Sequence, residues 1–374
     1  MENNEEISIM GIENTVAGLC REDRDLFEGI FELSTYTGKI VVTDSFKPRA
    51  VELFKATTDT IQDLIEEQTI IRTYNKWTNE AAIFNSLRSK RPGLSDEQKA
   101  KMRSSIDEEV KKAMQGCDFC DAENLTPEDI IRGGRVKTDH CVTASNVAKM
   151  DAWSSLIIFK EHHPLKITEE EFVDYVKTAN AWFERVHEVD PKAEYPLIGW
   201  NCLKQAGASQ CHGHMQLLMA RDRPYAELLV ELKAAEAYKG NDERKDYFRD
   251  LFVAHDLVGL GMRDKRSRIF PSLTPYKERE TVVMAPSEHV EDGKEMEDFS
   301  RSLFKVVDSM INEQGVYCFN VGIWLPKMND NSGRQPYIAK IVDRGPMIAV
   351  MEMYGESVVG IDPYRAAESL RKNI

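Results

Sequence analysis

The sequence lacks several features that would assign the protein to a special class. It contains no run of eighteen apolar residues, so no segment is predicted to span a membrane. Positive charge is in deficit: 49 Lys and Arg stand against 63 Asp and Glu, for a net charge of -14. This balance argues against a general nucleic-acid binder, which needs a basic face. A phosphorylated small substrate stays compatible with it, because such a site needs only a few local cations.

We also expect neither a secretion signal nor a disulfide framework. The segment from Met1 to Glu6 is acidic and has neither the basic nor the apolar region of a signal peptide. The seven cysteines are an odd number, which favours reduced thiols and metal ligation over disulfides. We therefore expect a cytoplasmic protein. Its 374 residues, 42% of them hydrophobic, suffice for two domains or for one built from two similar halves.

From residue 155 onward the sequence predicts the same order of elements twice. The first copy has a strand at 156–159, a Pro/His turn, a helix capped by Thr168, and strands ending near 200 and starting near 214. The second copy has a strand at 281–284, a Pro/His turn, a helix over 296–312, and strands over 317–325 and 337–342. This repeat indicates two halves of similar structure.

The first part of the chain is less regular. Residues 40–42 suggest a short strand and residues 51–68 an amphipathic helix. Ser95 opens a capping-box pattern and a charged helix that runs to about Gln115, which we interpret as a solvated surface helix.

The most informative segment is His212-Gly213-His214-Met215-Gln216, which continues into an apolar stretch. If this segment is a strand, alternation places His212, His214 and Gln216 on one face. Two imidazoles and a neutral amide on one face suit a nucleophile, a metal ligand and a donor to a phosphoryl oxygen. The alternative is a strand with two surface histidines.

Cys117-Asp118-Phe119-Cys120 is a Cys-x-x-Cys motif, which can supply two of the four ligands of a tetrahedral zinc ion. His163 and His212 are the obvious donors for the other two positions. Further candidates are His162, which competes with His163, and His140 and Cys211. The zinc would be structural and would hold the loop before His214. A redox pair and two core thiols are the alternatives.

In this order, the Cys-x-x-Cys, His163 and His-x-His-x-Gln motifs resemble the galactose-1-phosphate uridylyltransferase branch of the histidine-triad superfamily. Further similar segments are Phe84 to Pro92, Asn201 with Gly207-Ala208-Ser209, Glu352-Met353, and the last helix after Asp362-Pro363. The resemblance covers about residues 73–374. It implies an α+β fold of two histidine-triad halves, each a mostly antiparallel sheet with packed helices, and a homodimer.

The implied division of the chain has three parts. Residues 1–72 are an extension of unknown role, and residues 73–240 form the first half, with the zinc and the His-x-His-x-Gln motif. Residues 241–374 form a second, degenerate half with a sugar-contacting C-terminal loop.

The resemblance also implies ping-pong nucleotidyl transfer. It makes His214 the nucleophile and gives zinc the ligands Cys117, Cys120, His163 and His212. The residues expected around the nucleotide and its phosphates are Arg88, Arg91, Asn201, Ser209 and Gln216, and Glu352 is expected at the sugar. The alternative for Arg88 and Arg91 is a solvated basic run. Since Met351 precedes Glu352 where the galactose enzymes have tyrosine, galactose itself is in doubt.

The chemistry of His214 and Gln216 agrees with these roles. A neutral imidazole can attack the α-phosphorus of a nucleoside diphosphate compound and form a covalent nucleotidyl-histidine. Its other nitrogen needs an acceptor that fixes the tautomer, and we expect a backbone carbonyl within 207–210. Gln216 can donate its amide to the α-phosphoryl oxygens without being a rival nucleophile.

Three functions therefore compete. The first is a nucleotidyltransferase that moves a nucleoside monophosphate from a nucleotide sugar to a sugar 1-phosphate. The second is a nucleotide-sugar or diadenosine-polyphosphate phosphorylase, in which inorganic phosphate is the acceptor. The third is a zinc-stabilised nucleotide-binding protein without turnover. All three predict small-molecule partners rather than nucleic acid or membrane.

Overall fold

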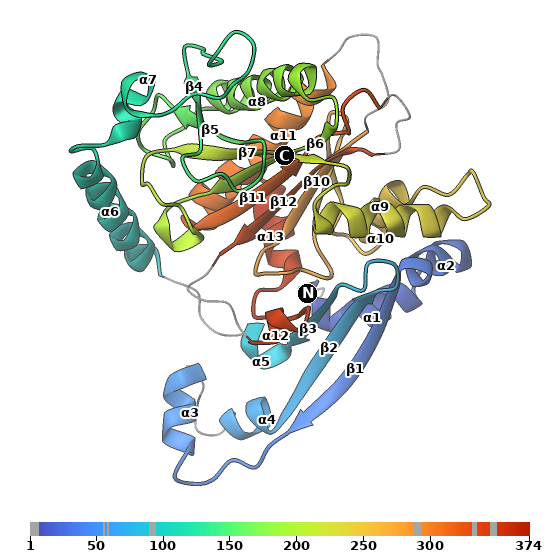
Figure 1. Cartoon of the computed structure of the whole chain (residues 1–374). Helices are drawn as coiled ribbons and strands as arrows, with labels where there is room; N and C mark the ends of the chain where they lie inside the picture. Colours follow the sequence, from blue (N-terminus) through green and yellow to red (C-terminus); the bar gives the residue numbers. More distant parts are fainter. Residues whose placement is uncertain are drawn as a thin grey trace.

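The computed structural model describes residues 7–54, 57, 60–89, 95–286, 294–330, 335–344 and 350–374. Their fold is α+β, with a nine-stranded and a four-stranded sheet (Figure 1). No helix in these ranges has the length and apolar character needed to cross a membrane.

The strands are β1 Phe31–Lys39, β2 Glu67–Asn75, β3 Ala81–Asn85, β4 Cys141–Ser145, β5 Ser154–Phe159, β6 Ala193–Asn201, β7 His214–Arg221, β8 Met262–Asp264, β9 Ser267–Pro271, β10 Thr281–Ala285, β11 Phe319–Trp324, β12 Tyr337–Asp343 and β13 Glu356–Val359. The helices are α1 Ile12–Ala17, α2 Arg21–Ile30, α3 Lys47–Phe54, α4 Ile61–Glu66, α5 Ser86–Ser89, α6 Asp96–Ala113, α7 Ala122–Leu125, α8 Glu169–Val189, α9 Ala226–Lys239, α10 Tyr247–Leu257, α11 Glu295–Asp308, α12 Val350–Met353 and α13 Pro363–Leu370.

The large sheet contains the repeat predicted from the sequence. Its strand order is β4-β5-β7-β6-β11-β12-β10-β9-β8, so that the first four strands and the next four mirror one another about the β6–β11 junction. At the centre of this junction Gly199 lies opposite Gly322. All the pairings of this sheet are antiparallel.

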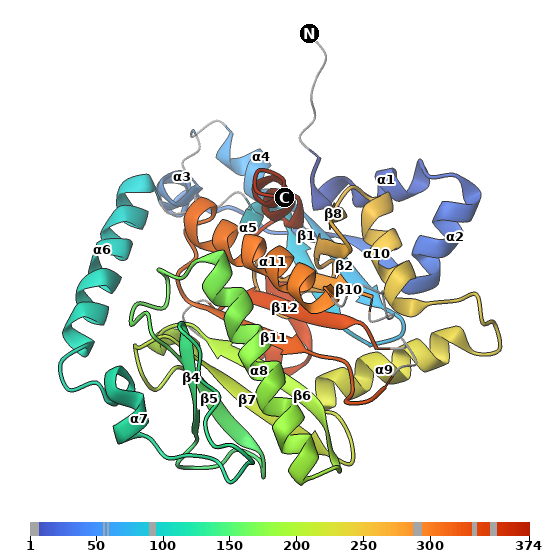
Figure 2. The same ribbon diagram turned by 90° about the horizontal axis from the view of Figure 1, so that it is seen from above.

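Helices α8 and α11 cover one face of the large sheet, one from each half (Figure 2). Both bonds of the expected capping box are present at the start of α8, where Thr168 and Glu171 bond each other's backbone N–H. The two helices are linked by an ion pair of 2.7 Å between Lys177 Nζ and Glu297 Oε2. Trp200 of β6 is buried on the helix-covered face, while Gly199 and Asn201 are partly exposed on the other. The alternation leaves that second face available for a site.

The small sheet joins the two ends of the chain, in the order β1-β2-β3-β13. Strand β2 crosses residue 72, so the first expected boundary falls inside a strand, and β13 runs parallel to β3. The hairpin of β1 and β2 extends away from the large sheet, with α3 and α4 at its far end (Figure 1). Helices α3 and α4 replace the single helix expected over 51–68, and β1 ends at Lys39, before the strand expected at 40–42.

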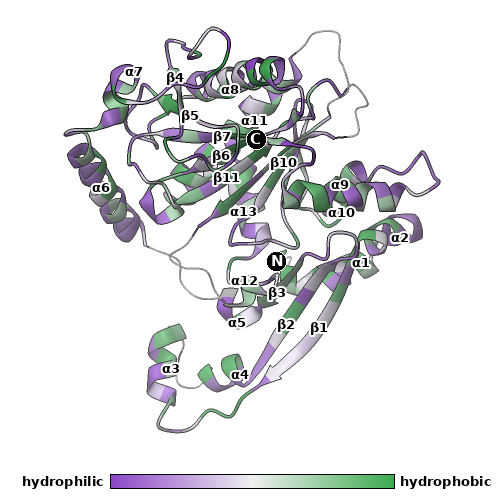
Figure 3. Ribbon diagram, in the orientation of Figure 1, coloured by the Kyte–Doolittle hydropathy of each residue, from purple (hydrophilic) through white to green (hydrophobic). Residues whose placement is uncertain are grey.

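Helix α6 begins as predicted, with both bonds of the Ser95–Gln98 capping box, and it ends at Ala113. Most of its length is hydrophilic (Figure 3). Most of the helix is exposed, as expected for a surface helix, but one side is anchored by the buried Ile106 and Val110. The residues that contact this side of α6 belong to the candidate site described below.

Candidate active site and metal centre

Two cysteines and two histidines from distant segments converge in front of β7. Cys117 and Cys120 lie at a single 3-10 turn, Asp118–Asp121, which follows α6. The Nδ1 atom of His212 lies 3.4 Å from Cys117 Sγ, and the Nδ1 atom of His162 lies 3.3 Å from Cys120 Sγ. The four donor atoms all lie within 4.8 Å of one another and can hold a metal ion.

Backbone carbonyls orient both imidazoles of this cluster. His212 Nε2 lies 2.7 Å from the Phe159 carbonyl, and His162 Nε2 lies 3.1 Å from the Val110 carbonyl. A carbonyl can only accept, so in the neutral rings each Nε2 carries the proton and each Nδ1 carries a lone pair. The two Nδ1 atoms are only 2.9 Å apart. Two lone pairs that face each other repel, and a cation that both nitrogens coordinate removes this repulsion.

His162 takes the place that we expected for His163. The His163 ring turns to the other side, where its Nε2 donates to Asp107 Oδ1 at 2.7 Å and its Nδ1 accepts the N–H of Leu165. Asp107 belongs to α6, so this helix selects which of the two adjacent histidines reaches the cysteines. Burial lowers the pKa of His163.

His214 is the first residue of β7 and is buried, with 4% of its surface exposed. Its Nδ1 lies 2.8 Å from the carbonyl of His212. Nδ1–H therefore donates to this carbonyl, and the lone pair of the neutral ring is on Nε2. Burial lowers the pKa of His214, which favours the neutral ring. The acceptor is thus a carbonyl, as expected, but it belongs to His212 and not to residues 207–210.

Packing fixes the His214 ring and the backbone that carries it. The Phe119 ring meets the rings of His214 and His212 edge-on, at 5.3 and 5.9 Å between centroids. Gly213 faces the Phe159 ring, and a Cβ at this position would lie 2.3 Å from a ring carbon. The Gly213 N–H donates to the His162 carbonyl at 3.0 Å. One turn therefore positions both the metal-binding imidazole and the nucleophile candidate.

Gln216 lies on the same face of β7 as His214, two residues further along. Its Oε1 accepts from Asn146 Nδ2 at 3.1 Å, which leaves the Gln216 NH2 group free to donate. The Oδ1 atom of Asn146 is buried without a hydrogen-bond partner. Asn146 was missed in the sequence, although its place directly after the buried strand β4 is a signal. Because His212 lies before β7 begins, strand alternation places only His214 and Gln216 on one face.

The sequence of the chain has little similarity to that of known proteins. No protein-family model matches the chain. An uncharacterized protein of Archaeoglobus fulgidus is 28% identical over 120 residues, which are 30% of this chain and 36% of that protein. The chain thus matches about a third of the length of this curated relative.

Solved structures match over a larger share of the chain. An ADP-glucose phosphorylase from Arabidopsis thaliana with bound ADP-glucose has a TM-score of 0.60 at 15% identity, over 80% of this chain and 97% of that chain. A GalT-like protein from Arabidopsis thaliana has a TM-score of 0.56 at 14% identity, over 69% and 92%. A uridylyltransferase variant has a TM-score of 0.53 at 11% identity, over 69% and 93%. The chain shares the fold of these three structures.

Asn201 is the last residue of β6, which pairs with β7 in the large sheet. Its Oδ1 accepts from Asn320 Nδ2 at 2.7 Å, and the same Asn320 NH2 group donates to the Ala206 carbonyl at 2.8 Å. Ser209 lies in the loop between β6 and β7 and is exposed. Gly207 in this loop has φ +99°, a conformation that favours glycine. Asn320 was not among the predicted site residues.

The other predicted residues that the structure describes do not lie beside His214. Arg88 is exposed on α5, beside the small sheet, and Arg91 lies outside the described residues. Glu352 is on α12, where its Oε1 lies 2.9 Å from Lys277 Nζ and its Oε2 is buried without a hydrogen-bond partner. The structure thus joins Cys117, Cys120 and His212 in one cluster, and His214 with Gln216 beside it. It assigns Arg88 and Glu352 to separate elements.

Proposed function

We propose that the protein is a nucleotidyltransferase that acts on nucleotide sugars through a covalent nucleotidyl-His214. The observation that carries this proposal is the bond from His214 Nδ1–H to the His212 carbonyl. It gives the neutral ring one tautomer and leaves its lone pair on Nε2, the atom that must attack phosphorus. A non-catalytic nucleotide-binding protein has no need of an imidazole held in this way.

In the first half-reaction the lone pair of His214 Nε2 forms a bond to the α-phosphorus. The bond from this phosphorus to the bridging oxygen breaks, and the sugar 1-phosphate leaves with the electron pair. The proton on Nδ1 stays in its bond to the His212 carbonyl, which stabilises the positive charge on the ring. The Gln216 NH2 group, oriented by Asn146, donates to the α-phosphoryl oxygens as their charge grows.

In the second half-reaction a phosphate oxygen of the acceptor attacks the same phosphorus. The nitrogen–phosphorus bond breaks, and His214 Nε2 recovers its lone pair. Asn201 and Ser209 are the proposed donors to the phosphate that leaves and to the one that enters. In this scheme Arg88 and Arg91 supply positive charge, and Glu352 contacts the sugar.

We assign Zn²⁺ to the cluster of Cys117, Cys120, His162 and His212. Zinc bonds of about 2.3 Å to sulfur and about 2.0 Å to nitrogen give tetrahedral edges of about 3.6 Å between nitrogen and sulfur and about 3.3 Å between two nitrogens. The nitrogen–sulfur distances in the structure are 3.4, 3.3 and 3.6 Å, and the nitrogen–nitrogen distance is 2.9 Å, so the two imidazoles must separate slightly when zinc binds. When bound, the ion would supply structural stability and fix the carbonyl of His212, to which the nucleophile bonds.

A phosphorylase is the second candidate. The solved structure with the TM-score of 0.60 is that of an ADP-glucose phosphorylase, and 97% of that chain is covered. The same nucleotidyl-His214 serves both reactions, and the difference is whether the acceptor is inorganic phosphate or a sugar phosphate.

The test is the intact mass of the protein after incubation with UDP-, GDP- and ADP-sugars and with diadenosine tetraphosphate, without acceptor. We expect one acid-labile nucleotide adduct, whose mass names the nucleotide. His214→Ala should abolish the adduct and lower the turnover rate by at least about 10⁴-fold, as in other enzymes that lose a nucleophile. His140→Ala, a substitution outside the site, should retain both.

The adduct is then treated with phosphate or with sugar phosphates, and the acceptor that discharges it separates phosphorylase from transferase. An adduct that persists in His214→Ala would refute the assignment of the nucleophile. A folded, zinc-loaded protein that binds these nucleotides but forms no adduct would instead be the non-catalytic binding protein.

A further inference from the structure

An open cavity of about 480 Å³ lies over the second half of the large sheet, beside the candidate site. Its floor is formed by alternate residues of β11, which are Asn320, Gly322 and Trp324, together with part of β12. Asn320 belongs to both places, because it lines the cavity and donates to Asn201 Oδ1 at 2.7 Å. Sites for small molecules commonly have about 300–1,000 Å³. The cavity is therefore a candidate for the part of the substrate that extends beyond His214.

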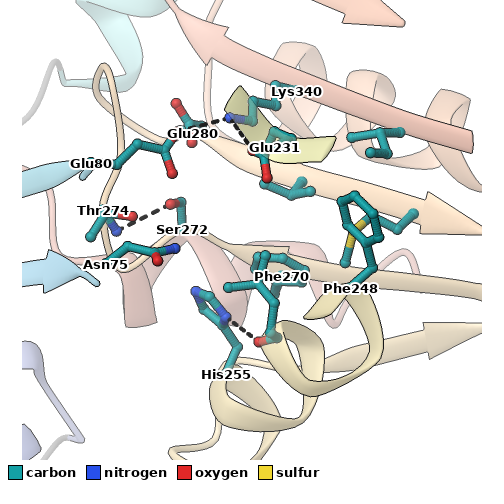
Figure 4. A pocket seen from close by; sticks show the side chains of 14 residues that line it. Asn75, Glu80, Glu231, Phe248, His255, Phe270, Ser272, Thr274, Glu280 and Lys340 are labelled. Atoms are coloured by element: carbon teal, nitrogen blue, oxygen red, sulfur yellow. Dashed lines mark hydrogen bonds and ion pairs between the residues drawn. The ribbon is translucent and has the colours of Figure 1, made fainter. Parts of the chain in front are cut away.

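Arg344 lines this cavity directly after the end of β12 and is partly buried there. Its guanidinium makes neither an ion pair nor a hydrogen bond with any residue in the described ranges. Lys340, by contrast, is held by three carboxylates, one of them Glu231 (Figure 4). Arg344 is thus available to a ligand. A planar guanidinium suits a phosphate group, because it can donate two parallel N–H bonds to the phosphate oxygens.

Two aromatic side chains give the cavity surfaces on which a sugar ring can pack. The six-membered ring of Trp324 lies over Gly322, since a Cβ at Gly322 would be 3.2 Å from Cη2 of that ring. The glycine thus lets the indole lie along the sheet as part of the floor. Tyr276 forms part of the wall and is 54% exposed. Aromatic faces bind the C–H groups of a sugar ring, whose hydroxyl groups need polar partners. Lys277 also lines the cavity, and its contact of 2.9 Å with Glu352 brings the residue expected at the sugar close to it.

We propose that this cavity binds the sugar 1-phosphate, as the leaving group of the first half-reaction and as the acceptor of the second. Arg344 binds the phosphate, and the sugar ring packs on Trp324. This role rests on the proposed nucleotidyl transfer and names the residues that select the sugar phosphate rather than the nucleotide.

The spacing of the strands fits this assignment. Gln216, the proposed donor to the α-phosphoryl oxygens, and Gly322, under the Trp324 ring, lie in one row across the sheet. They are two strand spacings apart, or about 10 Å, which a phosphate followed by a sugar ring can span. Because the cavity is open, the sugar phosphate can exchange while the nucleotide stays on His214, as the two half-reactions require.

The test measures binding to the full-length protein by calorimetry, which needs no adduct. The probes are the 1-phosphates of glucose, galactose, mannose and N-acetylglucosamine, with inorganic phosphate for comparison. We expect one equivalent of at least one sugar 1-phosphate to bind, more tightly than inorganic phosphate. Arg344→Gln should weaken this binding by about 10–100-fold, the effect of lost hydrogen bonds to a charged group. Trp324→Leu should weaken it by about tenfold and leave the affinity for inorganic phosphate unchanged, because it removes only the contact with the ring.

Arg49→Gln is the matched control, because Arg49 is an exposed arginine of α3, at the far end of the β1–β2 hairpin (Figure 1). It should bind the sugar phosphate as the wild type does. The proposal is overturned if the wild type binds none of the four sugar 1-phosphates, or if Arg344→Gln and Trp324→Leu bind them unchanged. It is also overturned if these two variants lose the binding of nucleoside monophosphates instead, because the nucleobase would then occupy the cavity. Binding that depends on Arg344 in a protein that forms no nucleotidyl adduct would refute the proposed transfer and not the cavity.

Discussion

The two halves of the large sheet carry different chemistry at equivalent positions. Gln216 on β7 lies opposite Gly199, Gly199 opposite Gly322, and Gly322 opposite Lys340 on β12. One row of residues thus crosses the centre of the sheet, with a neutral amide at one end and an ammonium at the other. In the first half the amide lies beside a neutral imidazole, while in the second the ammonium is bound by three carboxylates.

This comparison shows what the backbone determines and what it leaves open. The two halves share strand order and a covering helix, so these features alone do not identify the reactive half. In the first half backbone carbonyls hold His162, His212 and His214 and leave one ring nitrogen of each for another partner. In the second half the Lys340 ammonium is paired with the carboxylates of Glu80 and Glu231. The half with directed lone pairs is the one suited to metal binding and to nucleophilic attack.

The largest expected effect comes from the adjacent histidines of the first half. His162→Gln should lose the zinc, because its Nδ1 is one of the four ligands, and both stability and turnover should fall with it. His163→Gln should retain a full equivalent of zinc and cost about 1 kcal/mol through the lost bond to Asp107. Zinc content by mass spectrometry and thermal melts check this pair. Loss of zinc from both variants, or from His163→Gln alone, would contradict the ligand set.

The two ends of the central row provide a crossed test of the difference between the halves. Gln216→Leu should lower kcat by about 10²–10³-fold with little change in stability, since it removes a donor to the α-phosphoryl oxygens. Lys340→Met should leave adduct formation intact but cost about 3–5 kcal/mol, because buried carboxylates lose their counter-ion. Adduct kinetics and denaturant unfolding measure the two effects. A similar loss of kcat in both variants would mean that the second half takes part in the chemistry.

Gly213→Ala tests how tightly the backbone of the first half is specified. The added methyl group collides with the Phe159 ring, and we expect a cost of about 1–3 kcal/mol together with lower activity from a displaced His214. Gly29→Ala in α2 is the control, because a Cβ there meets nothing within 4 Å and alanine favours a helix. Unfolding curves of both variants check the contrast. Equal stabilities would show that the ring moves aside freely.

The sequence predicted the parts that depend on local pattern. The capping boxes at Ser95 and Thr168 are local, and so are the Cys-x-x-Cys and His-x-His-x-Gln spacings. The choice between His162 and His163 is not, because it depends on Asp107 and Val110 of α6. The four-stranded sheet was missed for the same reason, since β13 pairs with β3 across more than half of the chain. The apolar run at 40–42 suggested a strand, but Val41 is 87% exposed and the strand ends before it.

The smallest expected effect concerns Asn320, which joins the halves at the site. Its NH2 group donates both to Asn201 Oδ1 and to the Ala206 carbonyl, so it orients a residue of the first half from the second. Asn320→Ala should lower kcat/KM by about fivefold, corresponding to one lost hydrogen bond of about 1 kcal/mol. A double-mutant cycle with Asn201→Ala checks the route of this effect. If Asn320 acts through Asn201, its substitution changes little once Asn201 is alanine. Full additivity would show instead that Asn320 affects the reaction by a path that does not include Asn201.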